Sequence, residues 1–417
     1  MSIIPAVGAP SFDVLGDIVD QRLSGCTDAK GVKTRESRLS NFLDFLQNND
    51  IDNYLTVDPK WVDTVVSRYV VYIMNGYGCT SKYIESKTVK EYLKEINKHY
   101  TAHSLPPPWV NTAKTKTARL VKDKQTFEKE AKRREPLTQP CIETIFELAD
   151  HIGNDEDCFE CLMRDMVALG RYTGNRIQEY AQDKPHEIKY YHTPDGDVMR
   201  AFSVSNILFR DAHGMPLATS VAMDTPDLVV QVGTCYDIQK NRNNGQVLWY
   251  HRDTLNQNYC PVVRALSLVR RAIRLGQSSS DPLCVYLKNG VKVFLTANDV
   301  TNYFRYTMKL AHPTITDEML SAISTHSLRV TACILLAEAG KPIYFIKLRL
   351  RWKSNCFEIY LRNTSRVALQ HMQAITPGNI TRPRGTHVPL TIENLDDSLA
   401  EELGNITIGD YELEDED

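Results

Sequence analysis

Three consecutive prolines, Pro106-Pro107-Pro108, separate two parts of the chain that differ in their hydrophobic pattern. Proline cannot continue a helix, because it lacks the backbone N–H and its ring clashes with the preceding turn. Before the prolines, apolar residues recur at helical spacing around residues 39–46, 65–73 and 89–100. Residues 1–108 are therefore expected to form a helical domain.

The second part, residues 136–375, mixes two patterns. Helical spacing gives way to strand-like runs between Ala201 and Arg252, which are separated by turn residues. Helical spacing then resumes at Pro261. These patterns predict a mixed, mainly α fold, in which the second part is an α+β domain with a small antiparallel sheet.

A basic stretch joins the two parts. From Lys114 to Arg134 the chain has nine Lys or Arg residues and three acidic ones. We expect residues 109–135 to be a basic linker, whose charge would favour duplex DNA because each neutralised phosphate releases a condensed counterion. A solvated helix or coil without DNA contact is the alternative interpretation.

The formal net charge of −3 hides an uneven distribution. Residues 391–417 contain eleven Asp or Glu and no Lys or Arg, so the rest of the chain has 49 basic and 41 acidic side chains, a net charge of +8. We expect residues 376–417 to be an acidic, disordered tail. The tail either only improves solubility or competes with DNA for a basic groove.

No apolar run approaches the ~20 residues that a membrane-spanning helix needs, and the first fifteen residues lack the pattern of a signal peptide. We expect an intracellular protein with no membrane partner, located in the nucleus if the source is eukaryotic. The ten cysteines show no disulfide framework, and Cys158-Phe-Glu-Cys161 lacks the second pair of a zinc finger. A glycine-rich phosphate loop is also missing. Neither a metal nor a cofactor is therefore expected.

Separated segments of the second part contain residues suited to phosphate chemistry. Arg176 follows Thr173-Gly174, which can end a helix, and Glu179 lies three residues further on, where it can brace Arg176. His326 and Arg329 share one face at the start of an apolar helix. Taken alone, each pair is ordinary, since most Arg and Glu residues at this spacing form a surface ion pair.

Three further residues complete the set. Lys240 lies at the end of a predicted strand beside its hairpin turn, Trp352 follows Arg351, and Tyr360 comes after both. Together the segments resemble the tyrosine recombinase (phage integrase) family of DNA breaking-and-rejoining enzymes. That family shows, in order, T-G-x-R-x-x-E, a lysine on a β-hairpin, H-x-x-R, a His or Trp, and a tyrosine.

The resemblance covers most of the chain but leaves one position open. The family usually places its tyrosine nine positions after its His or Trp, which would select Arg351, whereas Trp352 lies eight positions before Tyr360. We choose Trp352, because losing one loop residue is a smaller change than replacing an indole by a guanidinium. The surrounding Leu-Arg-Leu-Arg-Trp-Lys-Ser-Asn-Cys-Phe replaces the Gly-His of bacterial and phage members and resembles transposon-borne eukaryotic members more closely.

The resemblance implies an integrase-like fold and site-specific DNA recombination through a 3′-phosphotyrosyl intermediate. Two arginine forks can hold the phosphate oxygens bidentately, a histidine can take the phenol proton, and a lysine can protonate the leaving 5′-oxygen. The implied catalytic residues are Arg176, Lys240, His326, Arg329, Trp352 and Tyr360.

The first part would correspond to the core-binding domain of the family. Its partner would be double-stranded DNA, and the family works as a homotetramer on paired sites. Basic residues on the expected helices and in the linker are candidates for phosphate contacts, although each could equally be part of a solvated face. They are Lys33, Arg35, Arg38, Lys87, Lys90, Lys94, Lys114 and Lys116.

Two alternatives to a recombinase remain. A type IB topoisomerase uses the same chemistry as a monomer to relax supercoils. A non-catalytic DNA-binding protein derived from a mobile element would keep the fold without the reaction.

Overall fold

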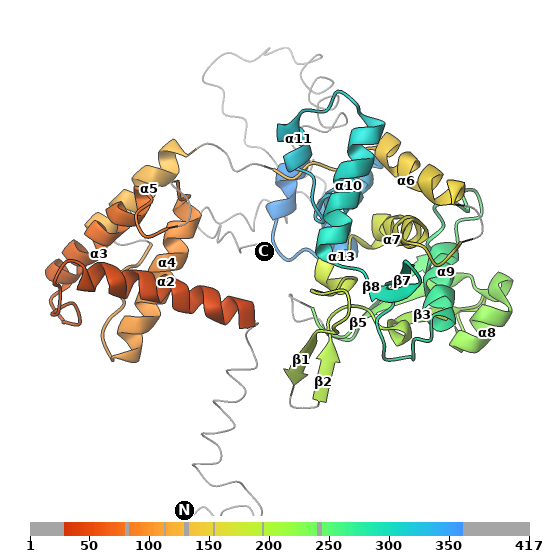
Figure 1. Cartoon of the computed structure of the whole chain (residues 1–417), viewed down its shortest axis with the longest axis horizontal. Coiled ribbons are helices and arrows are strands. Elements are labelled where there is room, and N and C mark those ends of the chain that lie inside the picture. The colour runs from red at the N-terminus through yellow and green to blue at the C-terminus, as the bar shows by residue number, and fades with distance from the viewer. Residues whose placement is uncertain are drawn as a thin grey trace, which may run out of the picture. The chain divides into compact units, whose positions relative to one another are not determined.

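The computed structural model describes residues 29–79, 83–111, 114–128, 133–152, 155–193, 196–239 and 244–361. These residues form two compact units, of which the second begins at Arg133 (Figure 1). The fold is mainly helical with small antiparallel sheets, which confirms the expected fold class. None of the described helices is both long and apolar enough to cross a membrane.

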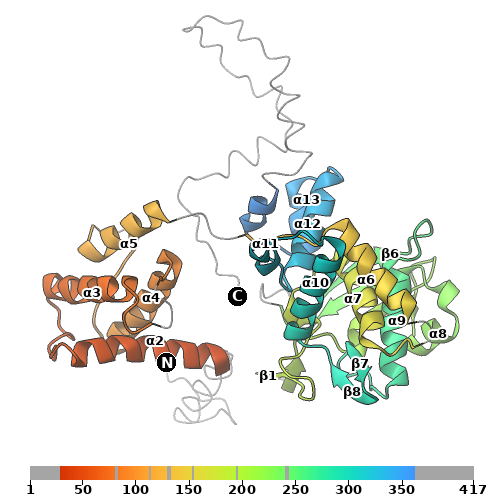
Figure 2. The same cartoon turned by 45° about the horizontal axis from the view of Figure 1, so that its top comes forward.

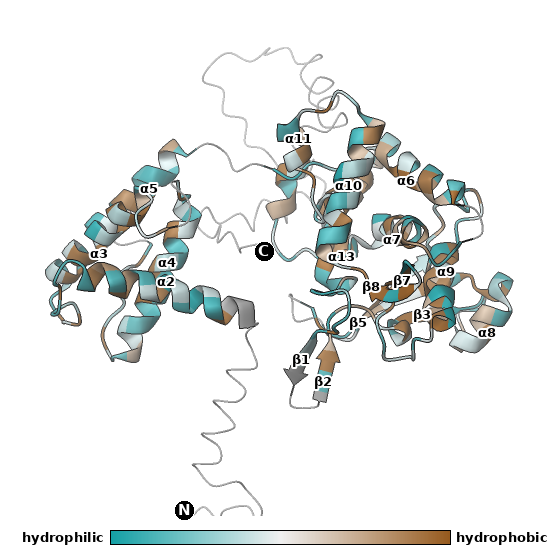
Figure 3. Cartoon of the chain, viewed as in Figure 1, coloured by the Kyte–Doolittle hydropathy of each residue, from teal (hydrophilic) through white to brown (hydrophobic). Residues whose placement is uncertain are grey.

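The first unit is a small helical bundle. Its helices are α2 (Ala29–Gln47), α3 (Pro59–Met74), α4 (Ser86–Ala102) and α5 (Lys116–Phe127). Each of them carries both hydrophobic and hydrophilic residues (Figure 3), and their apolar sides meet in a core that includes Phe42, Tyr69 and Leu93. The three stretches of helical spacing before the prolines thus lie in α2, α3 and α4, as expected.

Helix α5 lies inside the segment that we expected to be a linker. Its Val121 is buried in the same core. The Asp63 carboxylate on α3 accepts hydrogen bonds from the backbone N–H groups of Lys116 and Thr117 at 2.9 and 3.0 Å. The linker interpretation is therefore wrong for α5, because its apolar side packs on α3 and α4. The domain boundaries as a whole stay a prediction.

The second unit surrounds the buried helix α7. Figure 2 shows α6 and α9 beside it in a second view, and α12 also packs on α7. The longer helices of this unit are α6 (Gln139–His151), α7 (Phe159–Thr173), α9 (Pro261–Arg274), α10 (Ala297–Ala311), α12 (Ser327–Glu338) and α13 (Ile343–Leu350). The shorter ones are α8 (Thr219–Asp224) and α11 (Asp317–Ser321).

A four-stranded antiparallel sheet has the strand order β4-β3-β5-β6. Ile207 pairs with Thr234, and Thr234 pairs with Leu248 on the next strand. The strands are β3 (Ile207–Arg210), β4 (Pro216–Leu217), β5 (Gln231–Tyr236) and β6 (Gln246–His251). This confirms the small antiparallel sheet predicted between residues 201 and 252.

Two strand pairs were not predicted from the sequence. One consists of β1 (Tyr190–Thr193) and β2 (Gly196–Met199), and the other of β7 (Val285–Lys288) and β8 (Val291–Phe294). Each strand has only four residues, too few for a clear alternating pattern.

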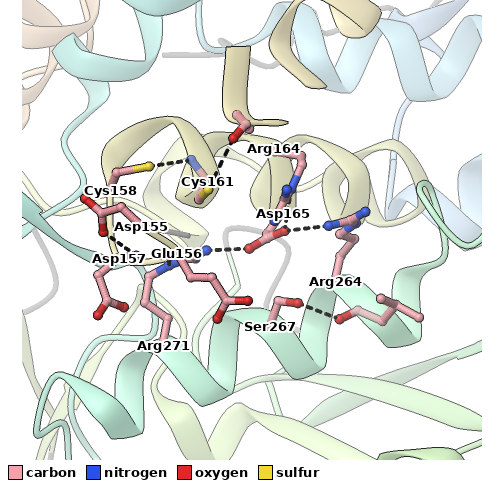
Figure 4. A network of polar contacts seen from close by, with 12 residues as sticks. Asp155, Glu156, Asp157, Cys158, Cys161, Arg164, Asp165, Arg264, Ser267 and Arg271 are labelled. Carbon is pink, nitrogen blue, oxygen red and sulfur yellow. Dashed lines mark hydrogen bonds and ion pairs between the residues drawn. The ribbon is translucent and has the colours of Figure 1, made fainter. Parts of the chain in front are cut away.

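A buried carboxylate fixes α7 against α9 (Figure 4). Asp165 is fully buried and accepts hydrogen bonds from Arg264 and Arg271 of α9 at 3.2 and 2.5 Å, and from Arg164 at 3.2 Å. The Cys158 thiol accepts a hydrogen bond from the backbone N–H of Cys161 and so caps the start of the helix. Among the described residues no group of three or more His, Cys, Asp or Glu is placed to hold a metal ion. These contacts hold α7 in place, and its far end leads directly into the candidate site.

Candidate active site

The candidate site lies where α7, α12 and α13 meet the single turn η4 (Cys356–Tyr360). Gly174 ends α7 in the left-handed conformation with φ 54°. A Cβ atom at this position would lie 2.8 Å from the Leu350 side chain, so only glycine fits without displacing it. The chain then turns sharply and presents Asn175 and Arg176 beside the ends of α12 and α13.

Glu179 is the centre of a buried ionic cluster. Its carboxylate accepts hydrogen bonds from the Arg176 backbone N–H at 2.8 Å and from the Arg351 guanidinium at 2.7 and 2.8 Å. The Arg176 guanidinium is 3.4 Å away. Burial alone would raise the pKa of Glu179, but Arg351 above all, with Arg176 and Arg329, lowers it to about 2. The bracing of Arg176 by Glu179, expected from their spacing, is therefore present.

Arg351 is the main cation of this cluster and is almost completely buried. Its guanidinium lies 3.7 Å from the centre of the Tyr236 ring and also bonds the Asn175 side chain at 3.2 Å. Its backbone has a left-handed φ of 59°, which costs a non-glycine residue of order 1 kcal/mol. The bidentate pair with Glu179 offsets this strain.

Trp352, rather than Arg351, lies against His326. The two rings meet edge to face, with centroids 6.2 Å apart. The Arg329 guanidinium lies 4.2 Å from the centre of the indole ring. The indole N–H is buried and has no hydrogen-bond acceptor among the described residues. The choice of Trp352 over Arg351 stays a prediction.

Arg329 is 1% exposed and bridges two of the converging elements. It donates hydrogen bonds to the backbone carbonyls of Gly174 and Leu350, the second at 2.8 Å. Two of the five N–H donors of an arginine are thus used to hold the ends of α7 and α13 together. Sequence reasoning had not foreseen this structural contribution.

His326 and Tyr360 form the contact with the clearest chemical meaning. The Tyr360 hydroxyl lies 3.3 Å from the Nε2 atom of His326. Burial, and then the positive charges of Arg329, Arg134 and Arg176, lower the pKa of His326 to about 3. The imidazole is therefore neutral at pH 7, and its Nε2 can accept a hydrogen bond from the phenol, with its own proton inferred to lie on Nδ1.

The described structure thus brings together five of the six residues singled out from the sequence. Contacts or close charges connect Arg176, His326, Arg329, Trp352 and Tyr360. Lys240 lies outside the described residues. The Arg176 side chain is 17% exposed and Tyr360 is half-buried, so both are more open to a ligand than Arg329.

Two further arginines of this site were missed. The Arg133 guanidinium donates a hydrogen bond to the Ile359 carbonyl at 3.0 Å, and the charge of Arg134 is felt by His326. Both lie in the basic stretch that we treated as linker, and nothing in their sequence spacing links them to residues more than 190 positions away. The folded chain, in contrast, places Arg133 at the start of the second unit.

The basic residues of the first unit that were expected to contact DNA occupy several helices. Lys33, Lys87, Lys94, Lys114 and Lys116 are exposed, whereas Arg35, Arg38 and Lys90 are half-buried. Arg38 and Lys94 share the partner Glu91, at 3.4 and 2.7 Å. Lys116 also lines a groove of about 680 Å³ between α3 and α5, together with Arg68 and Arg119, which sequence reasoning had not selected.

Comparison with known proteins gives structural neighbours only. No family model and no curated protein matches the chain. The Tn1549 transposon integrase in complex with transposon right end DNA has 16% identity and a TM-score of 0.45, covering 86% of this chain and 98% of the other. The XerA recombinase has 14% identity and a TM-score of 0.33, covering 88% of this chain and 99% of the other.

A second complex of the Tn1549 integrase, with circular intermediate DNA, has 14% identity and a TM-score of 0.37. It covers 74% of this chain and 84% of the other. These identities and TM-scores are too low to establish a function, which we therefore derive from the chain's own residues.

Proposed function

We propose that the protein is a tyrosine recombinase, which recombines double-stranded DNA at specific sites through a 3′-phosphotyrosyl intermediate. The observation that carries this proposal is the Tyr360 hydroxyl 3.3 Å from the Nε2 atom of His326. A phenol beside a neutral base, surrounded by arginines, is the arrangement that an attack on a phosphodiester requires.

The cleavage step begins when the Tyr360 oxygen attacks the scissile phosphorus. The negative charge of a bound phosphate would raise the pKa of His326, so that Nε2 can take the phenol proton while the bond between phosphorus and the 5′-oxygen breaks. The leaving 5′-oxygen needs a proton, which we assign to Lys240 as general acid. Rejoining is the reverse reaction, in which the 5′-hydroxyl of a partner strand attacks the phosphotyrosine, so no outside energy source is needed.

Charge develops on the non-bridging phosphate oxygens during both steps. Arg176 is the more accessible arginine, and Glu179 fixes the direction of its side chain. Arg329 contributes its charge from a buried position, and direct contact with phosphate would require the ends of α7 or α13 to shift, because it holds their carbonyls. The unpartnered indole N–H of Trp352 is a further donor for a phosphate oxygen.

DNA binding and assembly are the other parts of the proposal. The exposed basic residues of the first unit would follow the phosphate backbone of the duplex. Recombination joins two duplexes and therefore implies a homotetramer on paired sites.

The test uses nicked duplexes made from the DNA that flanks the chain's own gene. The proposal predicts a protein–DNA adduct that survives SDS, with the phosphate on the 3′ side and a free 5′-hydroxyl, and strand exchange between two duplexes. Adduct formation and supercoil relaxation without exchange would indicate a topoisomerase instead. DNA binding without any adduct would indicate a non-catalytic protein.

A further inference from the structure

The second unit begins with a short segment that hydrogen-bonds to one residue before His326 in the sequence and to one residue after it. The backbone N–H of Glu135 donates to the Ala322 carbonyl at 3.3 Å. Two residues later, the backbone N–H of the buried Leu137 donates to the Thr331 hydroxyl at 2.8 Å. These bonds hold the backbone of residues 135–137 along the start of α12, so the preceding Arg133 extends from a fixed base.

The Arg133 side chain extends from this segment to η4, the turn that contains Tyr360. Its Nη1 atom donates to the Ile359 carbonyl at 3.0 Å, across 226 positions of sequence. The last carbonyls of a helical turn have no partner within the turn, so a donor from outside is needed to satisfy them. A hydrogen bond from a charged guanidinium is stronger than one between neutral groups.

The carbonyl of Ile359 belongs to the same peptide plane as the Cα atom of Tyr360. Because the peptide group is rigid, a donor that fixes this oxygen also fixes the direction in which Tyr360 leaves the backbone. The other end of that side chain lies 3.3 Å from His326, just beyond the roughly 2.6–3.2 Å over which a proton is transferred. A small rotation of the plane would break the contact.

We propose that Arg133 is a positioning residue for the nucleophile. By holding the Ile359 carbonyl, it keeps the Tyr360 phenol within reach of His326. This inference rests on the proposed function, because it assigns Arg133 a part in DNA cleavage. Arg133 is the first residue of the second unit. Its hydrogen bond therefore connects the backbone beside Tyr360 to the end of the basic segment.

The test compares Arg133→Ala with a matched control in the full chain. The Arg252 guanidinium also donates to backbone carbonyls, those of Val229 and Pro226, but within the sheet region. Arg133→Ala is expected to slow adduct formation in single turnover by about 10²-fold, the typical effect of a displaced reacting group. Its DNA affinity should stay close to that of the wild type, and Arg252→Ala should change neither quantity.

Rescue separates positioning from a general structural role. Arg133→Lys keeps a positively charged donor and should recover part of the rate. Millimolar guanidinium should likewise speed cleavage by Arg133→Ala and leave the wild type and Arg252→Ala unchanged. If Arg133→Ala melts early, Arg133→Gln, which is too short to reach the carbonyl, replaces it.

The outcomes distinguish this inference from the proposed function. A wild-type protein that forms no adduct overturns the function itself. A wild type that forms the adduct, while Arg133→Ala or Arg133→Gln forms it equally fast, overturns the positioning role alone. Slow cleavage that guanidinium and Arg133→Lys both fail to restore, or an equal loss in Arg252→Ala, also overturns it.

Discussion

Removing the Arg351 side chain tests the buried ion pair on which the site is built. Arg351→Met keeps most of the apolar length but takes away the two shortest charged hydrogen bonds of Glu179, at 2.7 and 2.8 Å. The carboxylate would then remain fully buried, with the Arg176 guanidinium 3.4 Å away as its remaining ion-pair partner.

Two independent arguments give a similar size for the loss. The gap between an ordinary carboxyl pKa of 4.5 and the folded pKa of about 2 for Glu179 corresponds to about 3 kcal/mol at neutral pH. Removing one partner of a buried ion pair costs about 3 to 5 kcal/mol in other proteins. We therefore expect Arg351→Met to lower the free energy of unfolding by about 3 kcal/mol at pH 7.

The sign of the pH dependence follows from the lowered pKa. Between pH 4.5 and 2 the unfolded chain binds a proton that folded Glu179 does not, so the stabilisation is complete above pH 4.5 and is lost as the pH falls through 2. The difference between wild type and Arg351→Met should therefore shrink to roughly half at pH 3.

Urea unfolding at both pH values, followed by circular dichroism, measures these differences. Lys353→Met removes a charge from an exposed neighbour and should change stability by less than about 0.5 kcal/mol. Adding Glu179→Gln to Arg351→Met removes the stranded charge and should recover part of the loss. A loss below about 1 kcal/mol, or one of equal size at both pH values, would refute the reasoning.

Two further predictions concern other charged groups. Asp165→Asn should lower stability by about 3 kcal/mol in urea unfolding, because it removes the carboxylate that α9 arginines bind, whereas Asp150→Asn, at an exposed position, should have little effect. Arg176→Lys and Arg329→Lys keep the charge but lose the fork, so adduct formation should fall steeply while DNA affinity, measured by fluorescence anisotropy, changes little. Near-normal cleavage by both lysine variants would show that Arg176 and Arg329 have only a structural role.

Local patterns in the sequence predicted the elements of the fold well. Helical spacing located α2, α3 and α4, and strand-like runs between turns located the four-stranded sheet. These signals are reliable because each depends on residues a few positions apart. Helix α5 was missed because its basic composition outweighs a short apolar side, on which Val121 is buried.

The partners of single charged residues could not be predicted in the same way. Arg351 and Glu179 lie 172 positions apart, and Arg133 and Ile359 lie 226 apart. No periodicity connects such positions, so only the folded chain reveals that one arginine braces a carboxylate and the other holds a carbonyl. The family resemblance selected Trp352 and Tyr360 by order, but it gave no reason for Arg351 to be buried.

The most direct test of the central claim is to identify the residue that becomes joined to DNA. After the adduct is formed on a nicked duplex and digested with nuclease and protease, mass spectrometry should find the nucleotide remnant on the peptide that contains Tyr360. Tyr360→Phe should bind DNA normally and form no adduct, while Tyr344→Phe, which alters a tyrosine that is 62% exposed on α13, should form it as the wild type does. A remnant on another residue, or an adduct formed by Tyr360→Phe at the wild-type rate, would contradict the account.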